Sequence, residues 1–365
     1  MSNIIFIDFI LIIYIFEFIN NCTTAKIISL FMGSFVFYLL LYNVTYNSDW
    51  DNYETMYYFF ERPNDFLFNY IAGIFSSKGL EYSFVYKFHI LLMGTSFVYF
   101  ASRFSYLNVF AVISIYLLYQ IIPLSNQIRY YVAFSFFLIA VYNLIVSKKM
   151  GLFYIFAILS ILSHLAILLM YPFIYFYYKY KGKQYYKCLV SYSIVLAIFL
   201  YALSSVIFTN LFHFGEYFDE RLLSSLRGGI FSFLIWLLWL LLILKTNERL
   251  VVSTSNSIEI DIKYQFLYKL SIYPIIFIPT SLVIQIIGHR TILASIIVWV
   301  TYVLYSLTYE SSLNNRLRSM TIFLCLVWLT FYYQYILPTY LFGVSGTDLV
   351  EELIKYNESL NFLFL

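Results

Sequence analysis

The feature that most constrains this chain is a series of apolar stretches, most of them about as long as the hydrocarbon core of a membrane is thick. An α-helix needs about 20 residues, with a range of about 17–25, to cross that core. The stretches recur along the whole sequence, near 4–19, 27–43, 83–102, 106–122, 128–147, 188–208, 230–245, 266–287, 291–309 and 320–342. Such a series predicts an all-α, polytopic integral membrane protein.

Composition supports lipid as part of the solvent. The chain is 62% hydrophobic and 11% charged, whereas soluble domains carry about 25% charged residues. The surface of a soluble fold grows too slowly with mass to hide this much apolar area. The net charge of +3, without a long basic run, argues against nucleic acid as a partner. The three cysteines are scattered and form no metal-binding spacing.

Segment 151–178 is too long for one simple crossing and too short for two, and it carries Ser163-His164 near its middle. Lys and Arg favour the cytoplasmic side of membrane proteins. If the segment is broken or re-entrant and turns back, most of the 22 Lys and Arg residues lie inside. A single crossing would instead place the basic cluster 179–187 outside. We therefore predict about 11–12 transmembrane helices in a single transmembrane domain, 1–365, with both ends of the chain outside.

This topology gathers polar residues at one face. Loop 44–82, which is rich in Asp and Glu, becomes external, and His164 lies at the outward apex of the broken segment. Gln127 and Arg129 open a helix at the same face, and the pair His289-Arg290 lies there too. The tail 343–365 is predicted to be a short amphipathic piece at the surface.

Two carboxylates with aromatic neighbours follow the second apolar stretch, in Ser48-Asp49-Trp50-Asp51-Asn52-Tyr53. Aromatic rings stack on sugars, and carboxylates accept hydrogen bonds from sugar hydroxyls. A carboxylate here could also act as a general base. The alternative is a solvated acidic loop that obeys the charge bias.

Three basic groups at the same face are candidates for binding an anion. The planar guanidinium of Arg129 fits phosphate, and a helix N-terminus adds a favourable dipole. His164 lies within an apolar stretch, where ionisable residues are costly and often functional. His289-Arg290 forms a second cationic pair. The alternatives are an Arg that snorkels to the interface and a neutral His bonded to a neighbouring helix.

Several signals of soluble-substrate chemistry are missing from the sequence. It has no glycine-rich nucleotide loop, Walker motif, HExxH or CxxC. A nucleotide-sugar donor, which is cytoplasmic and often metal-bound, fits an outward-facing site poorly. We expect the donor to be carried in the membrane and to require neither a metal nor another cofactor.

These residues resemble motifs of the EpsG-type branch of the Wzy polysaccharide polymerases of bacterial O-antigens and capsules. The family has a small residue, Asp, an aromatic, two variable residues and Tyr after its second helix, as in Ser48–Tyr53. Glu61 matches a Glu that precedes an interfacial aromatic stretch. An Ile-Arg-Gln start to a helix is matched by Ile128-Arg129-Tyr130, where Gln127 is the nearest amide. Ser163-His164 matches a His before small apolar residues, and Arg290 matches a late Arg that opens a helix.

The resemblance implies an enzyme of the bacterial cytoplasmic membrane whose site faces the exterior. Such enzymes move a growing glycan from its polyprenyl pyrophosphate to a hydroxyl of a new lipid-linked unit. Donor and acceptor are then both polyprenyl-pyrophosphate-linked glycans held in membrane lipid, and a chain-length regulator protein is a further candidate partner.

The resemblance also assigns roles to the candidate residues. Arg129 and Arg290 would bind the pyrophosphate, and His164 would support them or move a proton. Asp49 or His164 would be the base. The residues expected to bind substrate are Trp50, Asp51, Tyr53, Glu61, Gln127 and His289.

Two other functions fit a chain of this class. A flippase for the same lipid-linked unit would distribute polar residues through the depth of a central cavity, whereas here they gather at one face. An O-antigen ligase would have a larger external loop between its late helices. We therefore favour the polymerase.

Overall fold

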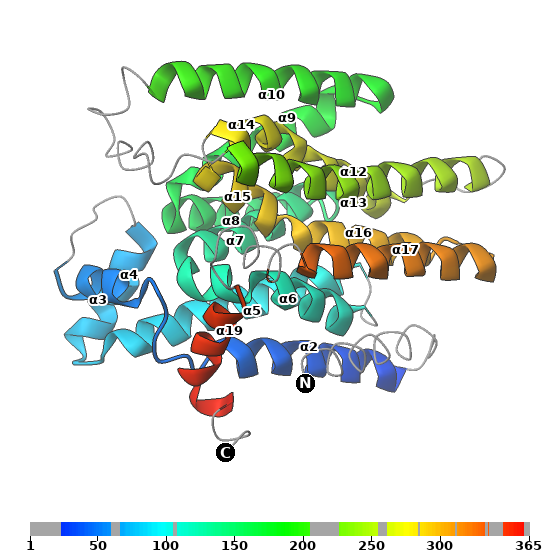
Figure 1. Cartoon of the computed structure of the whole chain (residues 1–365). Helices are drawn as coiled ribbons and strands as arrows, with labels where there is room; N and C mark the ends of the chain where they lie inside the picture. Colours follow the sequence, from blue (N-terminus) through cyan, green and yellow to red (C-terminus); the bar gives the residue numbers. More distant parts are fainter. Residues whose placement is uncertain are drawn as a thin grey trace. The chain divides into compact units, whose positions relative to one another are not determined.

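The computed structural model describes residues 23–59, 66–104, 108–204, 226–254, 261–283, 285–310, 312–332, 335 and 346–360. Within these ranges the fold is helical (Figure 1), and the one β-type contact is an isolated bridge between Val44 and Asn357. The all-α class predicted from the apolar stretches is therefore confirmed. The first predicted helix, 4–19, lies outside the described residues.

Among the described helices, four are long and apolar enough to cross a membrane: Tyr82–Ser102, Val109–Asn126, Ile128–Ile145 and Arg290–Leu307. Shorter apolar helices accompany them, at Ala25–Leu41, Phe66–Ser77, Met150–Ser163 and Leu165–Lys179. The chain is thus a multi-pass membrane protein, as its composition requires.

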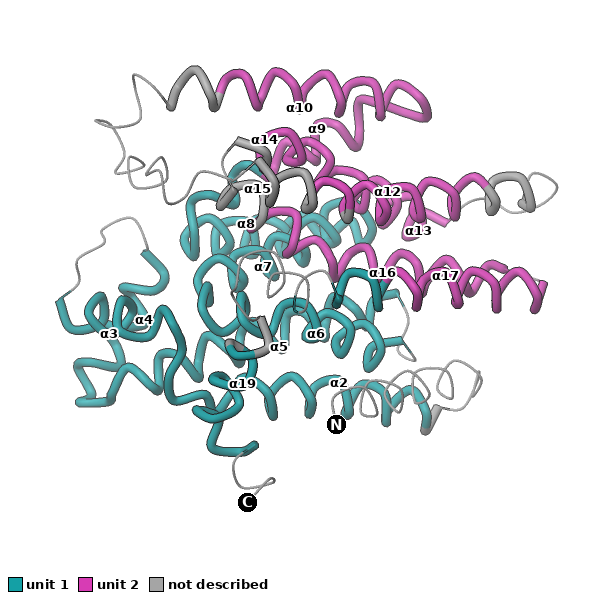
Figure 2. Tube along the Cα trace, in the orientation of Figure 1, with its two compact units in different colours: residues 1–169, 327–365 teal, residues 170–326 magenta. Residues whose placement is uncertain are grey.

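The chain divides into two compact units, residues 1–169 with 327–365 and residues 170–326 (Figure 2). The first unit contains α2 (Thr23–Leu41), α3 (Trp50–Phe59), α4 (Phe66–Ser77), α5 (Tyr82–Ser102), α6 (Val109–Asn126), α7 (Ile128–Ile145), α8 (Met150–Ser163), most of η1 (Leu165–Met170) and α19 (Gly346–Lys355). The second contains α9 (Pro172–Lys179), α10 (Gly182–Ser204), α12 (Leu226–Thr254), α13 (Ile262–Ile272), η3 (Tyr273–Phe277), α14 (Ile278–Val283), α15 (Gln285–Ala294), α16 (Ile296–Leu307) and most of α17 (Leu313–Phe331).

In the first unit α7 is the central helix, with nearly all of its residues buried. It packs along α8 and against α5, while α2 packs against α5 and α6. Small residues allow α8 to approach α7 closely, and the buried Ser160 hydroxyl donates to the carbonyl of Ala133 at 2.8 Å. Close approach through small residues and a polar bond is a typical way for membrane helices to associate.

Segment 151–178 is broken, as the sequence predicts. The helix α8 ends at Ser163, His164 is extended with φ −162° and ψ 119°, and the chain continues as the 3₁₀ segment η1. The next helix, α9, begins with Pro172 at its first position, where a missing N–H costs no helical bond. The break places His164 at a helix end.

In the second unit, two helix boundaries differ from those predicted from the sequence. The sequence predicts one helix over 266–287, but the chain is interrupted there as α13, η3 and α14. Pro274 stands in the first turn of η3, and Pro279 stands at the second position of α14. Proline lacks the N–H that would continue the preceding helix, so the break at this segment follows from its prolines.

The other boundary lies near Arg290. The sequence predicts a boundary between the stretches 266–287 and 291–309, with Arg290 opening the second helix, but α15 runs without interruption from Gln285 through Gly288 to Ala294. The turn comes later, at Ser295, whose hydroxyl donates to the carbonyl of Thr291 at 2.8 Å. That prediction was wrong because a single glycine is tolerated inside a helix at a cost of about 1 kcal/mol.

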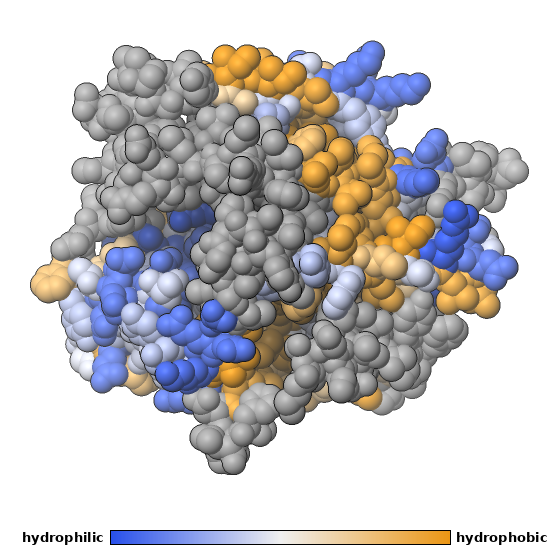
Figure 3. Space-filling model, viewed as in Figure 1, coloured by the Kyte–Doolittle hydropathy of each residue, from blue (hydrophilic) through white to orange (hydrophobic). Residues whose placement is uncertain are grey.

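The surface separates into apolar and polar regions (Figure 3), with hydrophilic residues gathered over α3 and α4. Large apolar side chains are exposed along α10, namely Val190, Ile194, Val195, Ile198 and Phe199. A row of this kind would be a liability in water but is ordinary where a helix meets lipid.

Candidate functional site

The candidate site is in the first unit and begins with residues 42–49, the site loop, which joins α2 to α3. Asp49 is its last residue, and the Asp49 carbonyl accepts the first helical bond of α3 from Tyr53 N at 3.1 Å. The Asn47 side chain fixes the loop, because its Oδ1 accepts from Asp49 N at 3.0 Å and its Nδ2 donates to Ser125 O at 3.2 Å. The half-buried Asp49 is therefore held by its backbone.

The end of α6 supplies the second contact to the site loop. Asn126 Nδ2 donates to the Ser48 hydroxyl at 2.6 Å. Gln127 interrupts the helices with φ −106° and ψ 47°, and α7 begins at the next residue. The Gln127 Oε1 atom is buried and has no hydrogen-bond partner, so a hydroxyl or N–H donor would complete it.

Arg129 is the second residue of α7 and lies over the aromatic residues of α3 and α4. Its guanidinium carbon is 4.8 Å from the centre of the Tyr53 ring and 5.8 Å from that of Phe68. A cation at this distance over a ring face is stabilised by the ring quadrupole, by about 2 kcal/mol when desolvated. The two rings therefore orient the guanidinium at the start of α7.

An aromatic cluster packs around the Tyr53 ring. The Tyr53 ring lies 5.7 Å from Phe68 and 6.4 Å from Tyr82, and Trp50 lies 4.8 Å from Tyr82 and 5.3 Å from Tyr86. All five side chains are buried. Trp50 and Tyr53 thus pack against protein rings, and their expected contact with a sugar remains a prediction.

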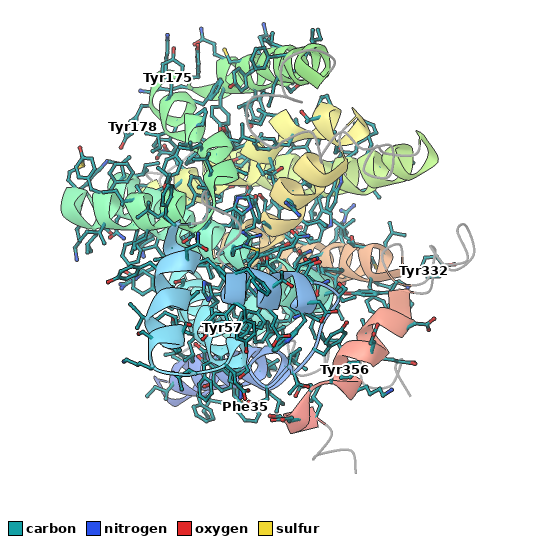
Figure 4. The ribbon with its side chains drawn as sticks, turned by 90° about the vertical axis from the view of Figure 1, so that its left-hand side faces the viewer. Phe35, Tyr57, Tyr175, Tyr178, Tyr332 and Tyr356 are labelled. Atoms are coloured by element: carbon teal, nitrogen blue, oxygen red, sulfur yellow. The ribbon has the colours of Figure 1, made fainter. Side chains whose placement is uncertain are left out.

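The helix α3 is also fastened at its other end. The hydroxyl of Tyr57, labelled in Figure 4, donates to the carbonyl of Leu80, just before α5. Burial raises the pKa of Tyr57, so this hydroxyl stays protonated as a donor. Both ends of the short helix are therefore tied to the longer helices.

His164 approaches the site from the broken end of α8. Its ring meets the ring of Tyr130 edge to face at 5.5 Å, and Tyr130 is the neighbour of Arg129. Its Nδ1 accepts from the backbone N–H of Ala166 at 3.2 Å. A ring nitrogen that accepts carries no proton, so the neutral imidazole holds its proton on Nε2. In this geometry His164 presents a donor rather than a base.

The first unit thus brings several sequence-predicted residues into one neighbourhood. Hydrogen bonds join the site loop to the end of α6, Tyr53 lies under Arg129, and Tyr130 contacts His164. Asp51 is exposed on α3 and accepts from the Tyr46 hydroxyl at 3.2 Å. A fixed cation, an N–H donor and a carboxylate in one neighbourhood suit the transfer of a group that leaves as an anion.

The remaining candidates are elsewhere. Arg290 is half-buried on α15 in the second unit. Glu61 lies outside the described residues, as does the side chain of His289. Within the described ranges no group of three or more His, Cys, Asp or Glu side chains could hold a metal ion.

Sequence reasoning missed the residues that support the site. Phe68 and Tyr82 read as ordinary apolar positions, yet both rings contact Tyr53. Asn47 and Asn126 offered a weak signal, since Asn at the end of a helix or in a turn commonly bonds to nearby backbone. Only the fold shows that these two amides join the loop to α6.

A family model matches most of this chain. The model describes the EpsG family, and the match covers residues 26–346. The matched range includes the site loop, Arg129, His164 and Arg290. No curated protein and no solved structure matches the chain.

Proposed function

Because the chain belongs to the EpsG family, we propose that it is a membrane glycosyltransferase that polymerises lipid-linked oligosaccharide repeat units. The reaction takes place on the outer face of the bacterial cytoplasmic membrane. The products are chains of an O-antigen, capsule or exopolysaccharide type, and the carrier is a polyprenyl pyrophosphate such as undecaprenyl pyrophosphate.

The reaction balances without an external oxidant or reductant. A hydroxyl oxygen of the acceptor unit forms a bond to the anomeric carbon of the donor glycan. The bond between that carbon and the pyrophosphate oxygen breaks, and polyprenyl pyrophosphate leaves with the electron pair. The hydroxyl proton passes to a base on the protein. Negative charge grows on the leaving oxygen, so a fixed cation beside it lowers the barrier.

The observation that carries the proposal is the placement of Arg129. Its guanidinium is held over Tyr53 and Phe68 at the first turn of α7, where the backbone N–H groups of the helix end also favour an anion. A planar guanidinium can bond two phosphate oxygens at once. This combination supports a pyrophosphate site.

The other residues take complementary roles in the proposal. His164 donates from Nε2 to the leaving phosphate, which leaves Asp49 as the base for the acceptor hydroxyl. The unsatisfied Oε1 of Gln127 accepts from a sugar hydroxyl, while Asp51 and Trp50 border the acceptor. The roles expected from the resemblance for Arg290, as a second cation, and for His289 and Glu61, as substrate contacts, stay predictions.

Disruption of the gene in its native host tests the proposal. We expect the surface polysaccharide to appear on a gel as a core with a single repeat, because units still cross the membrane but are not joined. Wild-type protein supplied in trans restores the ladder. Loss of even the single repeat would indicate a flippase or a ligase, and an unchanged ladder would contradict the proposal.

A further inference from the structure

The start of the site loop is paired with a segment that lies 311 residues later in the sequence. We name residues 346–360 the clamp segment; it comprises α19 and the turn after it. Glu358 N donates to Asn43 O at 3.1 Å. Thr45 donates to Tyr356 O twice, from its backbone N at 2.8 Å and from its hydroxyl at 2.9 Å. Figure 4 labels Tyr356 at the end of α19.

Asn357 is the centre of this pairing and is completely buried. Its Nδ2 donates to the carbonyls of Leu39 and Leu40, at 3.1 and 2.9 Å, which are among the last carbonyls of α2. Its Oδ1 accepts from the backbone N–H groups of Ser359 and Leu360, at 3.0 and 3.1 Å. The amide therefore caps α2 and shapes the clamp segment at once. No other uncharged side chain offers two donors and an acceptor in so small a volume.

A second line of contacts runs from the clamp segment to the acidic residues of the site. The Tyr356 ring lies 5.2 Å from the ring of Tyr46. The Tyr46 hydroxyl donates to Asp51 at 3.2 Å. This bond to the carboxylate raises the pKa of Tyr46, so the hydroxyl remains protonated, and thus a donor, throughout the neutral range.

The site loop is thus anchored at two points. The clamp segment holds its first residues, and the end of α6 holds Asn47 and Ser48. Asp49 follows directly after the second anchor. Because a short chain between two fixed points has few conformations, loss of either anchor would widen the range of positions open to the carboxylate.

We propose that the clamp segment is a positioning element for the acceptor side of the site, with Asn357 as its central residue. It holds the site loop so that Asp49 and Asp51 face the acceptor sugar. This inference rests on the proposed function. Residues 347–360 lie beyond the range of the family match, so the clamp is a feature of this chain that the family assignment does not supply.

A reversible crosslink tests the proposal. Val44 and Asn357 form the antiparallel bridge pair, flanked by the two backbone bonds. Such a non-hydrogen-bonded pair has Cα atoms about 4.5 Å apart, which is within the range for a disulfide. The variant Val44→Cys with Asn357→Cys is made in a background whose three native cysteines are replaced by alanine. Chain elongation is then followed in membrane vesicles that contain the host's own lipid-linked repeat units.

We expect the oxidised double variant to elongate chains and the reduced variant to elongate them at least about tenfold more slowly. The two rates are compared at an equal amount of protein in the membrane. A tenfold loss corresponds to a modest shift in the population of site-loop conformations. Reoxidation restores the rate, which a protein that had simply unfolded would not do. Asn357→Cys alone cannot form the crosslink, and we expect it to stay slow in both redox states. Glu351→Gln on the exposed face of α19, in the same cysteine-free background, is the control that retains activity in both.

Hydrogen exchange of residues 42–49 gives a readout independent of activity. We expect faster exchange in the reduced variant than in the oxidised one. Equal elongation in both redox states would overturn the inference while the proposed function stands, and so would unchanged exchange. A wild-type protein that elongates nothing would overturn the proposed function, and the inference with it.

Discussion

At the scale of the residue, the account depends first on the guanidinium of Arg129. Arg129→Lys keeps the charge but loses the planar fork and much of the contact with Tyr53. We expect polymer formation to fall by about 10²–10³-fold, as for removal of one key donor to a developing anion. The measurement is the length distribution of surface polysaccharide in the disrupted host that expresses the variant.

Arg103→Lys is the matched control for that substitution. The Arg103 guanidinium lies 4.1 Å from the ring of Tyr99 in the same unit, but at the predicted cytoplasmic end of α5. We expect this variant to form a normal ladder. Equal losses for the two variants would mean that Arg129 contributes to the fold rather than to the reaction.

Two substitutions of His164 distinguish a hydrogen-bond donor from a general base. His164→Gln can place an N–H₂ near the position of Nε2, whereas His164→Asn can replace only Nδ1, which accepts from Ala166 N. If His164 donates to the leaving group, the Gln variant retains more activity than the Asn variant. Elongation rates in vesicles decide this, and equal inactivity of both variants would favour His164 as the base.

The sequence predicts which residue types form the candidate site but not how they are held. Asp49 and Arg129 were identifiable because each is polar at the end of an apolar stretch. That the Tyr53 ring lies under Arg129 could not be predicted, because the two residues are distant in sequence. Their contact depends on how α3 and α7 each pack against α5. The tautomer of His164 likewise follows from a bond within the turn, which hydropathy does not report.

At the scale of the element, close helix packing around Gly94 gives a matched pair of substitutions. A Cβ atom at Gly94 on α5 would lie 2.7 Å from the ring of the buried Phe37 on α2, whereas one at Gly73 on α4 would meet nothing within 4 Å. Both changes to Ala gain helix propensity, by about 1 kcal/mol.

We therefore expect opposite effects from Gly94→Ala and Gly73→Ala. The first forces a ring out of a packed position and destabilises the protein by about 1–3 kcal/mol, while the second is neutral or stabilising. Thermal unfolding in detergent measures both. A Gly94→Ala protein as stable as wild type would show that α2 and α5 leave room for a methyl group beside the Phe37 ring.

Element boundaries were predictable where the sequence marks them strongly. The break near His164 was predicted because 151–178 has the wrong length for one or two crossings, and the structure confirms it. The interruption of 266–287 was missed because hydropathy continues across Pro274 and Pro279. The clamp segment was predicted only as an amphipathic tail, since its pairing with residues 43–45 joins positions 311 residues apart in sequence.

At the scale of the whole molecule, the predicted topology can be tested by labelling. Ser48→Cys and Lys181→Cys each introduce a thiol at an exposed position, in the background without native cysteines. We expect a membrane-impermeant maleimide to label Ser48→Cys in intact cells and Lys181→Cys only after permeabilisation, because Lys and Arg favour the cytoplasmic side. Labelling of Lys181→Cys in intact cells would place segment 179–187 outside the cell, contrary to the predicted topology.

The membrane class of the chain follows from composition, but its division into two compact units does not. Apolar stretches record that a helix meets lipid or protein, and they do not distinguish these neighbours, because both are apolar. The family match over residues 26–346 then connects this class of fold with polysaccharide synthesis, and the arrangement around Arg129 provides a chemical reason for that connection.

The most direct test of the central claim is reconstitution of the purified protein in liposomes with lipid-linked repeat units extracted from the disrupted host. The account predicts a ladder of longer glycans and the release of one polyprenyl pyrophosphate for each new linkage, with both products lost in Arg129→Ala. Repeat units that cross the bilayer but remain single would contradict the account, because the protein would then be moving its substrate rather than joining it.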